Sequence, residues 1–598
     1  MINKLPYLLR VKLRNISWLA HFYRKYIIRM PFYFEVPVTT EPDLDHYNQV
    51  KVVNDIALSL IPLVNCGPKI SLITPVYKPN LVHFQAMLES VFRQTYQNWQ
   101  LILVDDNSAC SELEKALQQA ELDERITVVR RSINGHISAA SNDGLKVADG
   151  EFIALLDHDD LLQKDALKVV ALYLQLQPDA NILYSDEDKI NEQGGFEQAH
   201  YKPKWNPDLL YSHNYVCHLG IYRKSLLDDI GGFRLGVEGS QDYDLLLRAV
   251  KQCKEQGIVH IPYVLYHWRI AQGSTALAGS EKSYTDDAGL KALQDYFTDY
   301  SGVSVESGLL SNTYKVNWPI PVIQPLVSII IPTKNGFELV KQCVDSVYKL
   351  TDYTNFEILL IDNQSDDSEA LDYFQQLVTE NKVRLLTYDQ PFNYSAINNY
   401  AVTQAKGEIV VLMNNDIEIL SRGWLTEMVS HCLRDDIGCV GAKLYYPNNT
   451  IQHGGVVLGI GGVAGHSHKY FPKDHPGYFK RLKITQNYSA VTAACLAVRK
   501  TVFEQVGGLN EKDLTIAFND VDFCLKVKQA GFRNLWTPYA EMIHHESVSR
   551  GGEDTPEKVE RFNKEVVYMK DTWAEVLEID PCYNPWLSQT REDFSYKL

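Results

Sequence analysis

The amino-acid sequence predicts an α/β protein with two similar domains in tandem, each built on a mostly parallel sheet, preceded by a basic helical arm. Three observations predict this class. The chain has 598 residues, which is too long for a single hydrophobic core. Short apolar runs typical of buried strands alternate with amphipathic helical stretches. The same succession of motifs then occurs a second time.

A domain duplication is indicated by motifs that recur at one spacing. Each copy opens with an apolar run that ends near a proline, at residues 70–77 and 327–334. Three pairs of residues are each 257 positions apart: Pro75 and Pro332, Asp105 and Asp362, and Asp159 and Asp416. Later pairs lie further apart, 276 positions for Gly232 and Gly508 and 278 for Asp242 and Asp520. The second copy therefore carries an insertion of about twenty residues, which we expect around the glycine-rich stretch 454–465.

These motifs divide the chain into five parts. We expect a basic helical N-terminal region at 1–66, a first domain at 67–311, a linker at 312–325, a second domain at 326–580 and a C-terminal tail at 581–598. The linker contains Pro319, Pro321 and Pro325, which stiffen it.

The composition excludes several classes of protein. Apolar residues at 45% and charged residues at 22% are ordinary for a globular protein. The ten cysteines form no CxxC pair, so neither a zinc ribbon nor a disulfide framework is indicated, and a reducing cytoplasm is the simplest compartment. The net charge of −17 argues against general nucleic-acid binding, which needs a basic surface.

Residues 1–34 differ from the rest of this acidic chain. They contain seven Lys and Arg residues and no Asp or Glu, interleaved with Leu, Ile and aromatic residues. Charge interrupts the segment too often for a membrane span. Two interpretations stay open: a helix that lies on an anionic membrane surface, and a helix packed on the first domain with its basic side in solvent.

The first acidic motif follows an early predicted strand of each copy. Asp105 ends the run 101–104, and Asp362 ends the run 358–361. A carboxylate at a strand end can accept the imide N–H of a uracil or thymine ring. The alternative is an Asx turn that begins the next helix, and either motif alone would favour the turn.

The next strand ends in Asp157-His158-Asp159-Asp160 in the first copy and in Asn414-Asn415-Asp416 in the second. Carboxylates one residue apart after a buried strand can hold a divalent cation such as Mg²⁺ or Mn²⁺ together with phosphate oxygens. An acidic turn by itself is more often a solvated helix start. Its repetition at a fixed distance favours the metal site.

Two further motifs recur near the end of each copy. Asp242 and Asp520 each open a helix-like run, where one Asp of the motif caps the helix and the other can serve as a general base. His267 and His544 each follow a Pro-Tyr dipeptide. A single histidine is usually structural, but its recurrence at the same place favours a metal ligand or a phosphate contact.

This ordered set of motifs resembles the family 2 glycosyltransferases, which have the Rossmann-like GT-A fold. The resemblance covers roughly 68–300 and 326–580, and is carried by VDDNS and IDNQS, LLDHDD and LMNND, SQDYD and FNDVD, and the late histidine. The segments YSDEDK (184–189), HHES (544–547) and DPCYNPWL (580–587) are similar to those of tandem-domain members. Such members act in the assembly of bacterial O-antigen, capsule or rhamnan-type polysaccharides.

The resemblance implies a role for each of these residues. Nucleotide-sugar binding is implied for Pro75, Tyr77, Asp105, Asp157, Pro332, Asp362 and Asn414. Metal binding is implied for Asp159, His267, Asp416 and His544, and the catalytic base for Asp242 and Asp520. Two positions depart from the pattern: Asn414 leaves the second copy one carboxylate short, and Gln241 stands where many members have Glu.

The resemblance therefore implies a bifunctional, inverting, metal-dependent glycosyltransferase that forms one linkage per domain. Its donors would be UDP- or dTDP-sugars, its cofactor Mg²⁺ or Mn²⁺, and its acceptor a glycan or lipid-linked glycan. We expect it in the cytoplasm, with peripheral contact at the inner membrane through the basic arm.

Two alternatives remain. In one, a single copy catalyses and the other binds glycan or braces the fold. In the other, the protein is a sugar nucleotidyltransferase, which would need a glycine-rich basic loop where this sequence has Tyr77-Lys78-Pro79-Asn80.

Overall fold

The computed structural model describes residues 44–64, 66–270, 283–545 and 555–597. The basic arm at 1–34 lies outside the described residues. The first described element is helix α3 (Leu44–Ser59), which packs against strands β7 and β9 of the first copy.

The first copy is a nine-stranded sheet in which eight strands follow the order β3-β2-β1-β4-β8-β6-β9-β5, and β7 pairs with β6. The strands are β1 (Ile70–Val76), β2 (Trp99–Asp105), β3 (Ile126–Arg130), β4 (Phe152–Leu155), β5 (Leu161–Leu162), β6 (Ile182–Ile190), β7 (Phe196–His200), β8 (Gly220–Arg223) and β9 (Ile258–Arg269). The helices are α4 (Leu81–Phe92), α5 (Ser111–Ala120), α6 (His136–Val147), α7 (Ala166–Leu176), α8 (Pro207–Ser212), α9 (Lys224–Asp229), α10 (Gln241–Gln252) and α11 (Ser283–Tyr296).

The second copy repeats this order strand for strand, as β14-β13-β12-β15-β22-β17-β23-β16. Its strands are β12 (Val327–Thr333), β13 (Phe356–Asp362), β14 (Arg384–Thr387), β15 (Ile409–Met413), β16 (Ile417–Ile419), β17 (Ile437–Tyr445), β18 (Ile451–His453), β19 (Val456–Leu458), β20 (Ala464–His466), β21 (Gln486–Tyr488), β22 (Cys495–Arg499) and β23 (Arg533–His544). Its helices are α12 (Phe337–Leu350), α13 (Ser368–Thr379), α14 (Tyr394–Gln404), α15 (Trp424–Cys432), α16 (Lys500–Gln505), α17 (Asn519–Gln529), α18 (Pro556–Thr572) and α19 (Ala574–Glu578).

The identical strand order confirms the tandem α/β architecture that the repeat predicts. The insertion in the second copy contains the β19–β20 hairpin and lies where the glycine-rich stretch indicated it. Between the equivalent strands β6 and β8 of the first copy, the chain forms only β7 and α8.

The sheets are mixed, which corrects the expectation of a mostly parallel sheet. Strands β1 to β4 are parallel, but β8 runs antiparallel to both β4 and β6. After β6 the chain turns back through β7 and the short helix α8, so it returns to the sheet in the opposite direction without the crossover helix that a parallel neighbour requires.

Strand β2 shows why the central strands read as continuous apolar runs. Leu101 and Leu103 belong to the hydrophobic core on one face of the sheet, and Ile102 and Val104 to the core on the other. Helices cover both faces, so both sets of alternating side chains are buried.

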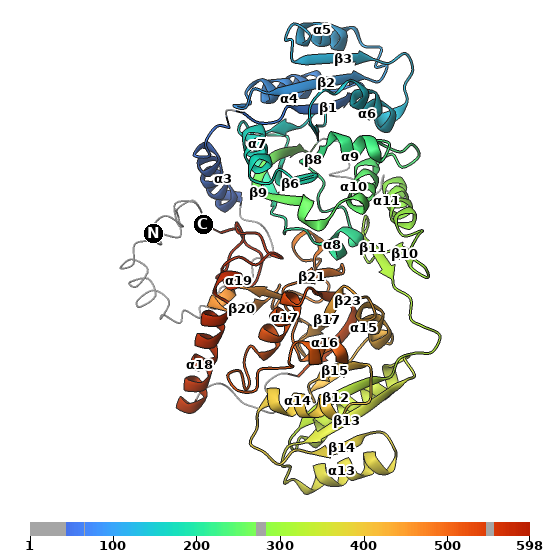
Figure 1. Ribbon diagram of the computed structural model, residues 1–598, viewed down its shortest axis with the longest axis vertical. Helices are drawn as coiled ribbons and strands as arrows, with labels where there is room; N and C mark the ends of the chain where they lie inside the picture. The colour runs from blue at the N-terminus through green and yellow to red at the C-terminus, as the bar shows by residue number, and fades with distance from the viewer. Residues whose placement is uncertain (1–43, 65, 271–282, 546–554, 598) are drawn as a thin grey trace.

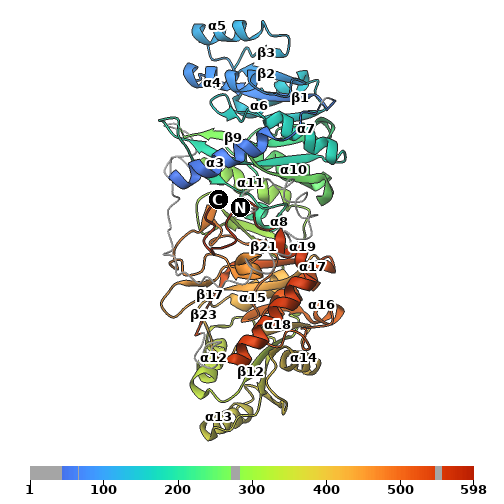
Figure 2. The same ribbon diagram turned by 90° about the vertical axis from the view of Figure 1, so that its left-hand side faces the viewer.

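The two copies are stacked along the long axis of the molecule (Figure 1). Strands β3 and β14 lie near the opposite ends, while α8 of the first copy and β21 of the second meet in the middle (Figures 1 and 2). At this junction Asn206 Nδ2 donates to the carbonyl of Asn487 at 2.9 Å, and Ser212 Oγ donates to that of Thr485 at 2.7 Å.

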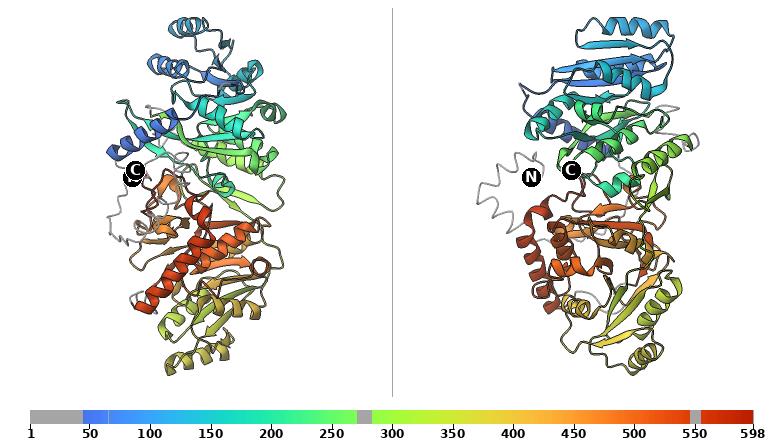
Figure 3. Two further views of the ribbon diagram at one scale, coloured as in Figure 1. Left: turned by 60° about the vertical axis from the view of Figure 1, so that its left-hand side comes forward. Right: turned by 45° about the vertical axis from the view of Figure 1, so that its right-hand side comes forward.

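The two segments expected to be a linker and a tail are more ordered than those terms suggest. Within 312–325, strand β11 (Tyr314–Asn317) pairs with β10 (Ser304–Ser307). The C-terminal segment lies between the two copies, while α18 crosses the outer face of the second copy (Figure 3). Both Tyr583 and Leu587 of this segment are buried in the core.

The described helices include none with an apolar stretch of the length that a bilayer crossing needs.

Two candidate active sites at equivalent strand ends

The predicted nucleotide-binding residues of each copy meet at the carboxyl ends of parallel strands. Val76 of β1 pairs with Asp105 of β2, and Thr333 of β12 pairs with Asp362 of β13. Pro75 and Pro332 precede these strand ends by one residue, and Tyr77 follows β1 with an exposed ring. This edge is where ligands bind in open α/β sheets.

Asp105 and Asp362 form the same turn in both copies. Each Oδ1 accepts the backbone N–H of the residue three positions later, from Ser108 and Ser365 respectively, at 3.0 Å. Each aspartate thus holds the following turn, but neither begins the next helix as the alternative to base recognition required, because α5 begins at Ser111 and α13 at Ser368. The turn occupies one carboxylate oxygen, so it is compatible with a contact from the other oxygen to a nucleotide.

The turn after β4 is tied to the end of β1. His158 Nδ1 lies 3.3 Å from the carbonyl oxygen of Pro75. In the second copy Asn415 Nδ2 donates to Thr333 Oγ1 at 3.0 Å. In each copy the turn predicted to bind a metal therefore lies beside the strand end predicted to bind the nucleotide.

The acidic residues of the first copy differ in exposure. The Asp157 side chain is 41% exposed, whereas Asp160 is buried. Asp160 accepts hydrogen bonds from the Arg269 N–H at 2.7 Å and from the Tyr266 hydroxyl at 2.5 Å. Burial raises the pKa of Asp160 well above its ordinary value, with Asp157 and Asp159 adding to the rise. Asp157 and Asp159 are therefore the accessible carboxylates of this motif.

His218 joins these carboxylates, although the sequence reasoning missed it. One ligand atom from each of Asp157, Asp160 and His218 lies within 4.8 Å of the others. His218 stacks on Tyr266 with a centroid distance of 4.5 Å, so its ring is held in place. Neither Asp159 nor His267 belongs to this group.

The structure turns His267 away from these carboxylates. Its Nδ1 bonds to Asp188 Oδ1 at 2.5 Å, and its ring packs on Phe196. On β9, His267 lies opposite Leu161, two residues after Asp159. On β23, His544 lies opposite Ile417, one residue after Asp416. The two pairings have the same register, because Leu161 pairs with His267 as Glu418 pairs with Ile543. His544 therefore occupies the position of Trp268, one residue beyond that of His267, and its side chain lies on the other face of the sheet.

In the second copy, His544 lies beside Asn414 and Asp416, which follow the equivalent strand. Its Nδ1 donates to Gln452 Oε1 at 2.8 Å, so its Nε2 carries the lone pair. Nε2 lies 3.1 Å from Asp416 Oδ1 and 3.2 Å from Asn414 Nδ2. An imidazole nitrogen and a carboxylate oxygen at this separation can share one divalent cation, and this donor set suits Mn²⁺.

Asp242 and Asp520 occupy the same place in the two copies, within the first turn of α10 and of α17. Both are half-buried. Asp242 Oδ2 accepts from Asn214 Nδ2 at 2.7 Å, and Asp520 Oδ2 accepts from the Ala493 N–H at 3.0 Å. Burial raises the pKa of both carboxyls, an effect that His218 opposes at Asp242 and the Ala493 N–H opposes at Asp520. A raised pKa is typical of a carboxylate that takes up a proton during catalysis.

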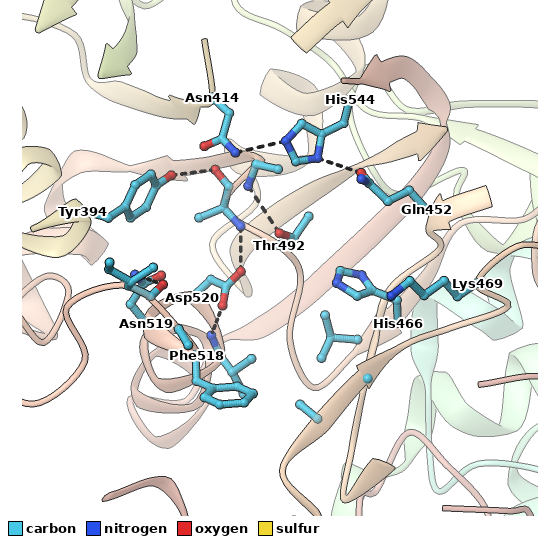
Figure 4. A pocket seen from close by; sticks show the side chains of 18 of the residues that line it. Tyr394, Asn414, Gln452, His466, Lys469, Thr492, Phe518, Asn519, Asp520 and His544 are labelled. Carbon is cyan, nitrogen blue, oxygen red and sulfur yellow. Dashed lines mark hydrogen bonds between the residues drawn. The ribbon is translucent and has the colours of Figure 1, made fainter. Parts of the chain in front are cut away.

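In the second copy Asp520, Asn414 and His544 line a cavity of about 420 Å³. Asn414 and His544 lie on one side of it and Asp520 on another, as Figure 4 shows. The inserted segment contributes Gln452, His466 and Lys469 to its wall. A cavity of this size can hold a sugar together with part of a nucleotide.

Comparison with known proteins agrees with the duplicated architecture. The family model described as "Glycosyl transferase family 2" matches residues 71–231 and 328–507, one region in each copy. The uncharacterized protein y4gI of Sinorhizobium fredii is 49% identical over 539 residues, which are 90% of this chain and 59% of that protein. The O-antigen biosynthesis protein RfbC of Myxococcus xanthus is 36% identical over 536 residues, 88% of this chain and 41% of that protein.

The chain thus spans less than two thirds of the length of either relative. Among solved structures, residues 1–349 of S. aureus TarS in complex with UDP-GlcNAc are similar at 20% identity and a TM-score of 0.33, covering 39% of this chain and 67% of that chain. The family assignment depends on the two matched regions, which together cover more than half of the sequence and coincide with the two copies seen in the structure. This chain belongs to glycosyl transferase family 2.

Proposed function

We propose that both copies of this glycosyltransferase are catalytic, and that each forms its own linkage by inversion at the anomeric carbon of a nucleotide-sugar. The observation that carries the proposal is the paired placement of Asp242 and Asp520. Each lies in the first turn of an equivalent helix, and burial raises the pKa of each. The residues at the strand ends, such as Asp105 and Asp362, support the proposal because they also occur in both copies.

In the proposed reaction the acceptor hydroxyl oxygen forms a bond to the anomeric carbon while the bond from that carbon to the nucleotide diphosphate breaks. The electron pair of the broken bond leaves with the diphosphate oxygen. Asp242 or Asp520 takes the proton of the attacking hydroxyl. The strand ends at Asp105 and Asp362 would orient the nucleotide, with Pro75, Tyr77 and Pro332 beside the base and ribose.

Asp416 and His544 are the residues that would hold a divalent cation in the second copy. In the first copy we assign this role to Asp157 and His218, which lie together, and not to His267, which bonds to Asp188. Asp159 lies outside that group and stays a candidate ligand on the resemblance alone. A bound Mn²⁺ or Mg²⁺ would offset the charge that develops on the leaving diphosphate. Asn414 leaves the second copy with fewer carboxylates, so we expect it to bind the cation more weakly.

We further propose that the donors are UDP- or dTDP-sugars and that the acceptor is a glycan or lipid-linked glycan of a bacterial surface polysaccharide. The name of RfbC, an O-antigen biosynthesis protein, supports this class of product. We place the reaction in the cytoplasm, with the basic segment 1–34 contacting the inner membrane. Loss of binding to anionic liposomes on deletion of 1–34, with turnover of a water-soluble acceptor retained, would support that contact. Unchanged liposome binding would favour a helix packed on the first domain.

Two single substitutions test whether both copies catalyse. Asp242→Asn and Asp520→Asn keep the size and the hydrogen bonding of the side chain but cannot take up the proton. Each should lower one transfer by about 10²- to 10⁴-fold, leave the other transfer intact, and stall the product after a different sugar. Mass spectrometry of products from a panel of UDP-, dTDP- and GDP-sugars measures this. If Asp520→Asn leaves every linkage at the wild-type rate, the second copy is a binding or structural module.

A further inference from the structure

The insertion of the second copy brings a pair of histidines to the cavity that contains Asp520. His453 ends β18 and His466 ends β20. Their Nδ1 atoms lie 2.9 Å apart, and their rings are nearly perpendicular at 84°. His453 is fully buried, whereas His466 reaches the cavity wall beside Lys469, across the cavity from Asp520 (Figure 4).

The hydrogen bonds around this pair fix which nitrogen of each ring carries the proton. The backbone N–H of Thr492 donates to His453 Nε2 at 3.4 Å, so this nitrogen is an acceptor and His453 carries its proton on Nδ1. That proton is donated to His466 Nδ1. His466 must then carry its own proton on Nε2, and Nε2–H is the free donor of the pair.

Both rings stay neutral at physiological pH, which keeps this arrangement in place. Burial lowers the pKa of His466 to about 3, and the positive charge of Lys469 contributes to the shift. Burial also lowers the pKa of His453 well below its ordinary value, with His466 and His544 adding to the effect. His466 therefore presents a fixed neutral N–H donor to the cavity, beside Lys469. Among the described residues that line the cavity, Lys469 is the only Lys or Arg.

The same short loop holds the histidine pair and the proposed base. The N–H of Thr492 contacts His453, and the N–H of the next residue, Ala493, donates to Asp520 Oδ2 at 3.0 Å. Two consecutive peptide groups thus contact His453 and Asp520, and His453 in turn bonds to His466. Asp520 would take its proton from the acceptor, so the space between Asp520 and His466 suits a part of the acceptor.

We propose that segment 451–470 forms an acceptor-binding subsite of the second copy, in which His466 Nε2–H donates a hydrogen bond to an oxygen of the acceptor sugar. The inference rests on the proposed function of the second copy. Tyr446 also lines the cavity and stacks on Tyr470 with a centroid distance of 5.2 Å, and such aromatic faces pack well against sugar rings. The first copy, with only β7 and α8 at the equivalent place, lacks this subsite, so the two copies select different acceptors.

The test uses the full chain carrying Asp242→Asn, so that only the second copy turns over. Methyl glycosides of glucose, galactose, mannose, rhamnose and N-acetylglucosamine serve as acceptors with the panel of nucleotide-sugars. His466→Ala should raise the acceptor KM by about 3- to 10-fold, the loss of one neutral hydrogen bond, and leave the donor KM and the pH profile unchanged. His466→Gln, whose amide can donate from a similar position, should restore part of the binding. His475→Ala serves as the control, because His475 lies outside the cavity lining and its Nδ1 accepts only from the nearby Gly477 N–H.

The outcomes separate this inference from the proposed function. An unchanged acceptor KM in His466→Ala overturns the subsite, as does a raised donor KM, which would place His466 on the nucleotide-sugar. Absence of any transfer by the Asp242→Asn chain would instead count against catalysis by the second copy. Saturation-transfer NMR with the same glycosides then measures acceptor binding independently of turnover. A glycoside signal that is present with the Asp242→Asn chain and lost on addition of His466→Ala supports the subsite. An equal signal in both chains, or none in either, overturns it.

Discussion

Asp208 of the first copy and Arg434 of the second form a buried ion pair across the junction, with Asp208 Oδ1 2.5 Å from Arg434 Nη1. Asn487 Nδ2 also donates to Asp208 Oδ2, at 2.8 Å. Burial alone would raise the pKa of Asp208, but Arg434 and Arg533 lower it, so the carboxyl is charged in the folded protein. The two copies are therefore joined by a matched pair of charges as well as by apolar packing.

Arg434→Met should lower the free energy of unfolding by about 3–5 kcal/mol, because it leaves a buried carboxylate without its partner. The double variant Arg434→Met with Asp208→Asn should recover much of this loss, since no uncompensated charge remains. Urea titration followed by tryptophan fluorescence measures both. Equal stability of the single variant and the wild type would show that solvent reaches this junction.

Asn584 of the C-terminal segment should be needed for stability although it lies far from both candidate sites in sequence. Its Nδ2 donates to Asp186 Oδ2 and to the Lys202 carbonyl, each at 2.8 Å, and all three residues are buried. Asn584→Ala leaves these acceptors without a donor and should cost about 1–3 kcal/mol. Thermal unfolding compares it with Ser301→Ala, a change at an exposed position. A melting temperature equal to that of the wild type would contradict this role.

Transfer by the second copy should require a divalent cation, and Asn414→Asp should lower the Mn²⁺ concentration that gives half of the maximal rate. The substitution adds a carboxylate beside Asp416 and His544, whereas His544→Ala removes an imidazole ligand and should have the opposite effect. Electron paramagnetic resonance of Mn²⁺ measures binding independently of turnover, with the exposed change Asp435→Asn as the control. Full activity in EDTA, or Mn²⁺ binding insensitive to His544→Ala, would refute this site.

Transfer by the second copy should fall as the pH decreases through a value above the ordinary pKa of aspartate, because burial raises the pKa of Asp520. A raised folded-state pKa also means that the charged carboxylate costs stability above the ordinary pKa, and that the cost disappears as the pH falls below it. Asp520→Asn should therefore abolish transfer without lowering the melting temperature at pH 7.

Asp522→Asn is the matched control on the same helix. Asp522 is buried, accepts from Trp573 Nε1 at 2.9 Å and pairs with Lys526, so this change should lower the melting temperature. Rate–pH profiles and calorimetry at pH 7 and pH 4 measure these effects. Destabilisation by Asp520→Asn equal to that by Asp522→Asn would indicate that Asp520 is a structural cap.

The sequence by itself determined the duplication, the α/β class and the strand ends that carry the acidic motifs. These features follow from local pattern: an apolar run of fixed length buries a strand, and a turn residue directly after it must lie at the edge of the sheet. Pro75 and Asp105 therefore had to lie close together, as did Pro332 and Asp362.

Only the tertiary structure decided which distant segments meet at these edges. His218 reaches Asp157 from a segment far along the chain, and no local pattern marks it. His267 and His544 follow the same dipeptide, but His267 is the fifth residue after Pro262 and His544 the sixth after Pro538. The strand pairings have the same register, so this one-residue difference in spacing places the two rings on opposite faces of their sheets. The proton positions of His453 and His466 depend on hydrogen bonds from a loop further along the chain. The approach of His218 to Asp157 and the hydrogen bonds of His453 and His466 join segments that are distant in sequence, so they depend on packing and not on the local spacing of residues.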